Sequence, residues 1–501
     1  MSSSGHRRSR RSFDYGSSSS SSASGKSTRA STGDTDVPGG DPCSKRLSGS
    51  LSRGGSPESS YPSWVLLNQF GACRDGFHGD RTTSATSRTS NGKQVSVSLE
   101  LVEPPGTSVL IVDYPQAQAP STSFPQVIAA HRDVVLLDII SPGSCRASDG
   151  HDHFVYQASS SSSSSSRRPS LSPLPAPPEI VLMDQENMGV MPSTSQDQAD
   201  DEDPSFMVAH LETSWQCPGS KPSEATVHMF RSAGSGEWET FENLRVRRCH
   251  GGRDLWWWST DAVVPYQGRF LIWVDYYRGV ILLDTSSQSE KDAPPLELRY
   301  VPLPLDKDAV STDPDDIELG RGQPEESRCV CATRDGIKFV SVDTRHCSSF
   351  GVGHLGMLKW KHTFWVTTWS LREDNGCGYT WIKDATMSQG ELWAALDSDS
   401  ERQCIPHMTP EFPVVNMENP DAVCFRLDDD DDSDDDDPEE PAWMIEVHMK
   451  KKALLAATAY SKKKCLNGVK VDEGTIKSAR TDSYDHALFP SELPSYLDGK
   501  H

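Results

Sequence analysis

Two cysteines, Cys329 and Cys331, are separated by one residue, so both side chains lie on one face if this segment is a strand. Four further potential metal ligands follow nearby: His346, Cys347, His354 and His362. Structural zinc sites normally use two pairs of ligands at short C-x₂₋₄-C or similar spacing, and the second pair is missing here. The pattern therefore favours small buried thiols in a sheet, and we expect no metal.

Gly351, Gly353 and Gly356 in GVGHLG have the G-x-G-x-x-G spacing that lets a backbone approach a dinucleotide pyrophosphate. In such sites a helix follows the glycines, and its N-terminus holds the phosphate. The residues that follow here, MLKWKHTFWVTTW, alternate like a strand. The motif therefore predicts a glycine-rich turn, and we expect no cofactor.

An acidic run at residues 428–437 contains nine Asp around Ser433 and could in principle bind calcium. It lacks the turn glycine and the spaced oxygen ligands of an EF-hand loop, and mutual repulsion favours an extended, solvated segment. Ser433 is a candidate phosphorylation site for an acid-directed kinase. We find no G-x-S-x-G, no H-E-x-x-H and no catalytic triad order, so we predict no catalytic residue and a protein that is not an enzyme.

Five aromatic residues are the candidate interaction or structural residues: Trp256, Trp257, Trp258, Tyr276 and Tyr277. Consecutive side chains on a strand point to opposite faces, so three tryptophans in a row require either two packed faces or an exposed ring. Packing is the simpler explanation. Exposed rings would instead form an anchor for a partner protein.

Short runs of β-branched, aromatic and aliphatic residues recur along the chain and are separated by turn signals. Glycine-containing turns at 275–279, 334–336 and 374–376 predict three hairpins. Only residues 453–460 could equally form a helical turn. The predicted strands cover residues 95–101, 109–112, 127–130, 134–140, 154–156, 206–211, 225–231, 238–244, 270–274, 279–283, 296–305, 329–332, 337–342, 360–371, 379–382, 423–427, 444–447 and 453–459.

Residues 270–274 and 279–283 are apolar at consecutive positions, which predicts sheets buried on both faces. Large side chains also occupy both faces of residues 360–371, with Trp360, Phe364 and Val366 on one side and Trp365, Trp369 and Leu371 on the other. A sheet held between two neighbouring sheets has this property. We therefore predict a mostly β, β-propeller-like fold of about five or six blades, with a two-domain β-sandwich as the alternative.

The chain has 501 residues, only 35% of them hydrophobic, and a mean hydropathy of -0.56. Polar low-complexity stretches explain the low values, because they cannot bury enough apolar surface to fold. We predict a disordered N-terminus at 1–60, a first β region at 61–157, a Ser/Pro-rich linker at 158–204, a second β region at 205–466 with an acidic loop at 428–440, and a disordered tail at 467–501.

The formal net charge is -23, and residues 428–440 contribute eleven of the negative charges. Nucleic-acid binding requires a basic face, so we do not expect a nucleic-acid partner. No apolar run has the roughly 18 residues of a membrane span, and we expect no membrane partner. Twelve cysteines without a secretory signal indicate an intracellular protein in the cytoplasm or nucleus, although the Ser/Arg-rich N-terminus also fits an organelle transit peptide.

Several segments together resemble the domain of unknown function 1618 family, a plant family expanded in grasses. They are SWVLLNQFG, PQVIAAHRDVVLL, DLWWWSTDAVVPYQGRFLIWVDYYRGVILLDT, LRYVPLP, WIKDATMSQGELW, NPDAVCFRL and WMIEVHMKKKALL, spread over residues 60–460. The resemblance implies no established activity. The pairing of GVILLDT with LRYVPLP also looks like the propeller domains of plant F-box proteins, but residues 1–60 cannot form the helical F-box.

These observations favour a non-enzymatic protein-interaction scaffold with an unknown protein partner. The alternatives are an enzyme with its active site in a propeller channel and a nuclear regulatory factor that uses the lysine clusters. Convergence of several titratable side chains in one concave pocket would favour the enzyme. Nuclear accumulation would favour the regulatory factor.

Overall fold

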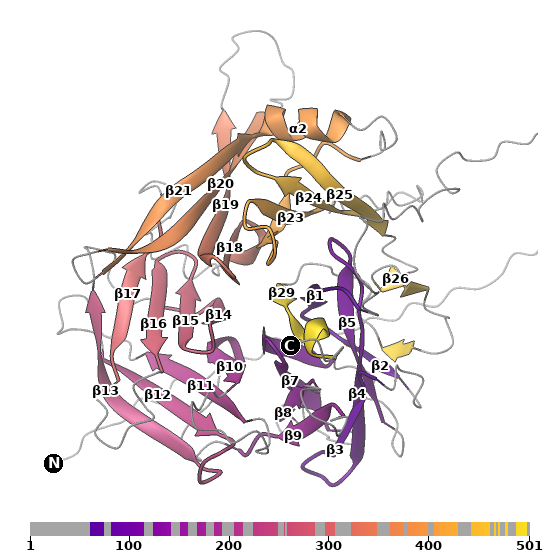
Figure 1. The fold of residues 1–501 in the computed structure, drawn as a ribbon, viewed down its shortest axis with the longest axis vertical. Coiled ribbons are helices and arrows are strands. Elements are labelled where there is room, and N and C mark those ends of the chain that lie inside the picture. The colour runs from indigo at the N-terminus through magenta and orange to yellow at the C-terminus, as the bar shows by residue number, and fades with distance from the viewer. Residues whose placement is uncertain are drawn as a thin grey trace, which may run out of the picture. The chain divides into compact units, whose positions relative to one another are not determined.

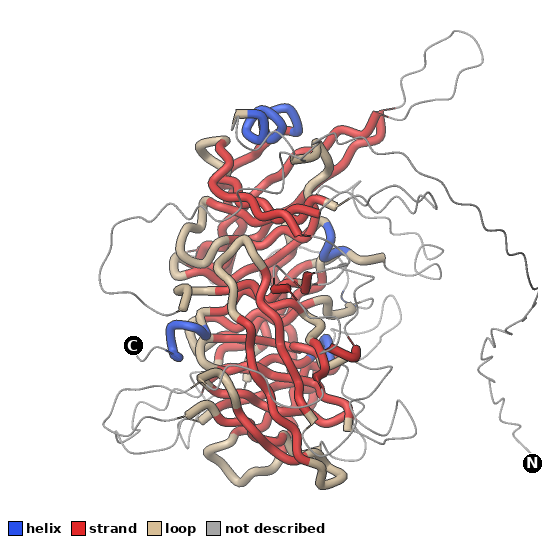
Figure 2. The backbone as a smooth tube through the Cα atoms, turned by 90° about the vertical axis from the view of Figure 1, so that its right-hand side faces the viewer, coloured by secondary structure: helices blue, strands red, loops and turns tan. Residues whose placement is uncertain are grey.

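The computed structural model is built mostly from β-strands, as the sequence predicts, with few helices (Figure 2). A compact unit spans Ser59–His501. The structure describes residues 61–74, 82–114, 124–141, 151–158, 168–176, 185–192, 205–213, 224–248, 255, 258–285, 296–305, 322–347, 361–374, 378–398, 405–428, 442–460, 465–466, 469–470, 476–478 and 487–497.

Three sheets are four-stranded meanders in which each strand pairs antiparallel with the next one in sequence (Figure 1). The first contains β6 (Gln126–His131), β7 (Val134–Ile140), β8 (His151–Gln157) and β9 (Ser170–Pro173). The second contains β18 (Arg328–Thr333), β19 (Gly336–Cys347), β20 (Lys361–Asp374) and β21 (Gly378–Ser388). The third contains β22 (Glu411–Val415), β23 (Ala422–Leu427), β24 (Ala442–His448) and β25 (Ala453–Tyr460).

Two further meanders are joined edge to edge in an eight-stranded sheet. One contains β10 (Met188–Pro192), β11 (Phe206–Thr213), β12 (Glu224–Arg231) and β13 (Trp238–Arg248). The other contains β14 (Ala262–Tyr266), β15 (Phe270–Asp275), β16 (Gly279–Asp284) and β17 (Leu298–Pro302). The outer strands β13 and β17 pair in parallel, which links the two meanders at the edge away from β10 and β14.

The remaining large sheet combines both ends of the described chain. It contains β1 (Val65–Asn68), β2 (Ala72–Arg74), β3 (Ala85–Arg88), β4 (Gln94–Glu100), β5 (Thr107–Asp113), β28 (Ile476–Ser478) and β29 (Leu488–Ser491). The yellow strand β29 lies antiparallel beside the indigo strand β1, with Val65 opposite Ser491 and Asn68 opposite Leu488 (Figure 1). A short helix, α3 (Leu493–Leu497), follows β29. A two-stranded sheet of β26 (Cys465–Leu466) and β27 (Val469–Lys470) is separate.

The strands at the inner ends of these sheets contact one another in a closed circuit: β6 with β10, β10 with β14, β14 with β18, β18 with β22, β22 with β29, and β29 with β6. Such a circuit is the arrangement expected of a β-propeller-like fold, in which the inner strands surround a central channel. The number of blades stays a prediction.

The sheets that contain β15 and β20 are buried on both faces, which explains the consecutive apolar residues in these strands. On β15, Leu271 and Trp273 join one hydrophobic cluster, whereas Ile272 and Val274 join the cluster on the opposite face. On β20, Phe364 packs toward β22–β25 while Trp369 packs toward β14–β17. The prediction of two packed faces is therefore correct for both segments.

Two parts of the predicted domain map differ from the structure. The segment 158–204, predicted to be a linker, contains β9 and β10, and the segment 467–501, predicted to be a tail, contains β29 and α3. The residues Gln389–Asp397 form the helix α2, which the sequence analysis missed. Residues 453–460 form the strand β25 rather than a helical turn. Residues 1–60 and the acidic run after Asp428 lie outside the described residues.

We expect Trp273→Ala to destabilise the fold by about 3–5 kcal/mol, because a large, fully buried side chain is removed from the middle of a packed sheet. The Trp273 indole Nε1 also donates a hydrogen bond of 2.9 Å to the carbonyl of Asn187. Chemical denaturation measures the loss. Ile382→Ala is the matched control, because the Ile382 side chain is 51% exposed. Equal unfolding midpoints for the two variants would contradict two-sided burial.

We expect truncation after residue 486 to lower the melting temperature, because it removes β29, which closes the circuit, and the fully buried Leu493. The point variant Leu493→Ala should have a smaller effect in the same direction. Differential scanning calorimetry compares both with the full chain. A truncated chain that melts like the parent would show that β29 and α3 are dispensable.

Candidate functional site

A cavity of about 650 Å³ lies among the inner strands of the circuit. Its walls come from β6, β14, β18, β22 and β29, and from the short 3-10 helix η2 (Gln185–Asn187) before β10. These segments are far apart in sequence and meet only because the sheets close on one another. The cavity is therefore the place where distant parts of the chain could act on one ligand.

Ionisable side chains of both signs line this cavity. The described acids are Glu186, Asp261 and Glu325, and the bases are Arg328 and His131. The phenol of Tyr276 and the thiols of Cys329 and Cys331 also line it. The cavity thus combines groups that can carry charge, donate protons and react as nucleophiles.

His131 Nε2 is buried and has no hydrogen-bond partner among the described residues. Burial disfavours the charged ring and lowers the pKa of His131 to about 3, with a further contribution from the neighbouring Arg132 guanidinium. His131 is therefore a neutral imidazole at neutral pH, able to accept or donate one hydrogen bond.

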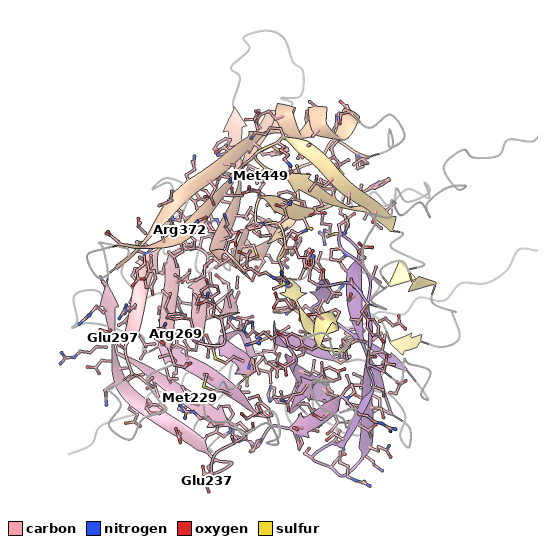
Figure 3. The ribbon with its side chains drawn as sticks, in the orientation of Figure 1. Met229, Glu237, Arg269, Glu297, Arg372 and Met449 are labelled. Atoms are coloured by element: carbon pink, nitrogen blue, oxygen red, sulfur yellow. The ribbon has the colours of Figure 1, made fainter. Side chains whose placement is uncertain are left out.

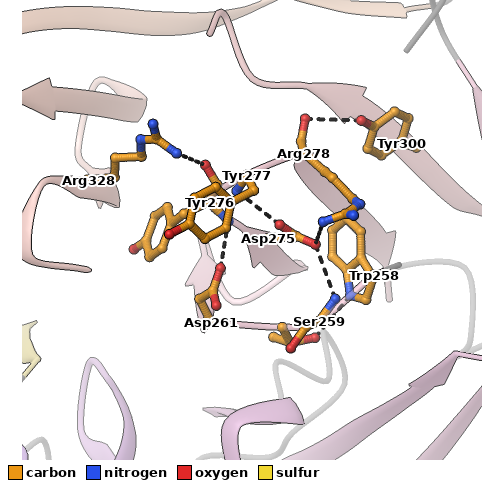
Figure 4. Close-up of polar contacts among 10 residues, drawn as sticks. Trp258, Ser259, Asp261, Asp275, Tyr276, Tyr277, Arg278, Tyr300 and Arg328 are labelled. Atoms are coloured by element: carbon orange, nitrogen blue, oxygen red, sulfur yellow. Dashed lines mark hydrogen bonds and ion pairs between the residues drawn. The ribbon is translucent and has the colours of Figure 1, made fainter. Parts of the chain in front are cut away.

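The turn between β15 and β16 is held by the buried carboxylate of Asp275 (Figure 4). One oxygen accepts hydrogen bonds from the Ser259 backbone N–H at 3.1 Å and from Arg278 Nη1 at 3.2 Å. The other accepts from the Tyr277 backbone N–H at 2.9 Å. Because its two oxygens already accept three bonds, Asp275 fixes the turn rather than serving as a free acid or base.

Tyr276 extends this network into the cavity. Its backbone N–H donates to Asp261 at 2.7 Å, and its carbonyl accepts from Arg328 Nη1 at 2.8 Å. The Tyr276 hydroxyl accepts from the Val330 backbone N–H at 3.3 Å. Two of the cavity's charged groups, Asp261 and Arg328, are thus engaged in positioning the backbone of this turn (Figure 4).

At the start of the next strand, Gly279 approaches the neighbouring strand so closely that a Cβ would lie 2.4 Å from the Val301 carbonyl. The Tyr300 hydroxyl donates to the Arg278 carbonyl at 3.0 Å. Any residue other than glycine would push β16 and β17 apart. The sequence DYYRG is therefore the signature of a tightly bonded turn.

The structure separates the predicted aromatic residues. Trp258 is buried and donates from Nε1 to Thr260 Oγ1 at 3.1 Å. Tyr276 is buried beside the cavity, whereas Tyr277 is half-buried with the Arg328 guanidinium 5.2 Å from its ring centre. Trp256, Trp257 and Ser433 lie outside the described residues. The glycines at 351, 353 and 356 also lie outside them.

Sequence reasoning missed the cavity. Its titratable residues have no common spacing, since Glu186, Asp261 and Arg328 lie in or just before three different meanders. In the described part of the chain, no three His, Cys, Asp or Glu side chains are grouped as metal ligands. No described helix is long and apolar enough to cross a membrane.

Outside the cavity, the described side chains differ in exposure. Side chains such as those of Met229 and Met449 are buried, whereas Glu237 lies exposed at the turn before β13 (Figure 3). Two large apolar side chains are exposed in the described structure, Ile382 on β21 at 51% and Leu455 on β25 at 43%. Each belongs to the last strand of its meander.

We expect Asp275→Asn to destabilise the protein by about 1–3 kcal/mol, because an amide cannot accept from all the donors that face the carboxylate. Asp284→Asn is the matched control on the same hairpin. Asp284 pairs with Arg269, and both side chains are more than one-third exposed, so its loss should cost less than about 1 kcal/mol. Urea denaturation distinguishes the two. Equal losses would contradict the assigned role of Asp275.

Residues 273–424 match the family model described as "Protein of unknown function (DUF1618)". The match begins in β15 and ends in β23, so it includes the DYYRG turn and the β18 wall of the cavity. A search of the curated proteins found no match. The match over residues 273–424 supports the resemblance to this family that the sequence predicts.

Proposed function

We propose that the chain is a non-enzymatic protein-interaction scaffold that acts inside the cell, in the cytoplasm or the nucleus. The supporting observation is the character of β25, the last strand of its meander. It reads ALLAATAY, has no charge or proline, and exposes Leu455. Natural edge strands are normally protected by charged residues, proline or a covering element.

The edge of β25 that has no strand partner in the described structure suggests how a partner would bind. In the described structure β25 pairs with β24 on one side, and no strand pairs with its other side. An extended partner segment could add a strand there through main-chain hydrogen bonds and seat an apolar side chain on Leu455. The helix α2 contacts β25 and frames this surface.

The bonding of the β15–β16 turn also supports a scaffold. Asp261 and Arg328 in the cavity wall, and Asp275 in the adjoining turn, hold backbone groups. Side chains used in this way give rigidity, and a rigid surface loses little entropy when a partner binds.

We expect Leu455→Glu to reduce recovery of a direct partner on the order of tenfold, since burying a charge against an apolar contact costs more than about 1.4 kcal/mol. Thr344→Glu is the control, because it adds the same charge at an exposed strand position on β19. Affinity purification with quantitative mass spectrometry from cells measures recovery, and a binding assay with purified components establishes direct contact.

The two variants should melt at the same temperature as the parent chain. Identical recovery of every partner by the parent, Leu455→Glu and Thr344→Glu would contradict a binding surface on β25. Loss of partners with both variants would show that the effect is not specific to β25, and would contradict a binding surface on this strand.

The second candidate is an enzyme whose active site occupies the cavity. The gathering of Glu186, Glu325, Tyr276 and two thiols there favours it, because convergent titratable groups in a concave site are typical of catalysis. A metabolite that raises the melting temperature of the parent chain, and is turned over, would support this function over the scaffold.

A further inference from the structure

Cys329 and Cys331 form a close pair of thiols in the cavity wall. They occupy alternate positions of β18, and their Sγ atoms are 3.1 Å apart. Both are thiols in the structure, and both line the cavity. Cys331 is 2% exposed and Cys329 is half-buried, so a reagent must be small to reach them.

The two sulfurs have different surroundings. Cys331 Sγ accepts a hydrogen bond of 3.4 Å from the Val415 backbone N–H on β22. The hydrogen bond between the two sulfurs, which either thiol could donate, lowers the pKa of Cys331 although burial opposes it. The same bond, together with burial, raises the pKa of Cys329. Cys331 is thus the better nucleophile, and Cys329 keeps the proton.

We propose that Cys329 and Cys331 are a redox-active dithiol, which hydrogen peroxide or another small hydroperoxide converts into an intramolecular disulfide. The inference is independent of the proposed scaffold function. It rests on the sulfur separation, the Val415 hydrogen bond and the position of both thiols in the cavity wall.

The reaction balances in two steps. The Cys331 thiolate attacks one peroxide oxygen, the O–O bond breaks, and hydroxide leaves and takes up the proton that Cys331 had released. The product is a sulfenic acid on Cys331. The Cys329 sulfur then attacks Cys331 Sγ, the S–O bond breaks, and the departing hydroxide takes the Cys329 proton. Two thiols and one peroxide give one disulfide and two waters.

The geometry suits this second step. The sulfurs must approach from 3.1 Å to about 2.05 Å, the length of a disulfide bond. Because both residues belong to one strand, the closed ring bends the backbone of β18. Strained disulfides are reduced readily, so we expect thiols to restore the pair. Cys424, also buried, lies among apolar neighbours and burial raises its pKa, which makes it slow to react.

Trypsin provides a direct assay, because cleavage after Arg328 and Arg334 releases the peptide CVCATR with both cysteines and no other. The full chain is treated with hydrogen peroxide at concentrations increasing from equimolar, quenched, alkylated and digested. We expect CVCATR to appear without alkylation and lighter by two hydrogens, and to return to the doubly alkylated form after dithiothreitol. Cys73 and Cys424 should stay alkylated at the same dose.

Two variants assign the roles. In Cys329→Ser the sulfenic acid on Cys331 cannot be resolved, so dimedone should label Cys331. In Cys331→Ser, labelling at Cys329 should be at least about tenfold weaker, since the remaining thiol has the higher pKa. Melting temperatures equal to that of the parent establish that both variants are folded. If either variant fails to fold, disulfide formation in the CVCATR peptide of the parent chain tests the proposal by itself.

Several results would overturn the proposal. One is a CVCATR peptide that stays doubly alkylated until Cys73 and Cys424 also react, which would show that the pair has no special reactivity. Oxygen addition to both sulfurs without a link between them, or stronger dimedone labelling of Cys329 than of Cys331, would equally show that the dithiol is not redox-active in the way proposed.

Discussion

Burial of the central strands on both faces, as in β15 and β20, is the constraint on which the rest of the structure depends. An isolated sheet with apolar residues at consecutive positions would expose one face to water, at a cost of about 25 cal/mol for each Å² of apolar surface. Here neighbouring sheets cover each other, as the alternate residues of β15 and β16 show by joining two different clusters. The pairing of β29 with β1 completes the circuit, so that the first and last described sheets are no longer free ends.

The cavity and the DYYRG turn are consequences of that closure. Inner strands from separate sheets meet around a space that side chains do not fill, and polar groups line it. In the described structure each inner strand is the last strand in the pairing order of its sheet or meander. Asp275 then binds the turn at the end of β15, while Asp261 and Arg328 attach it to β14 and β18. The same wall carries Cys329 and Cys331, so the tightly bonded turn and the two thiols lie close together.

Sequence reasoning predicted the middle strands well and the inner strands poorly. Residues 134–140 coincide with β7, since a strand buried on both faces reads as a nearly continuous apolar run, interrupted here at Asp138. The inner strands β14, β22 and β29 were missed because each contains a proline: Pro265, Pro413 and Pro490. Proline is tolerated there, since the edge of each strand that faces the cavity needs no ladder hydrogen bond. The helix α2 had a readable signal in Ser388 and Glu391, whose carboxylate accepts the Ser388 backbone N–H at 2.8 Å.

Hydrogen exchange with mass spectrometry on the full chain tests whether both ends of the described chain share one sheet and close the circuit. The amides through which β1 and β29 bond to each other are predicted to be protected together and to exchange with the same opening free energy. If residues 488–491 exchange at the rate of an unstructured peptide while residues 65–68 stay protected, β29 does not pair stably with β1, and the closure described here is contradicted.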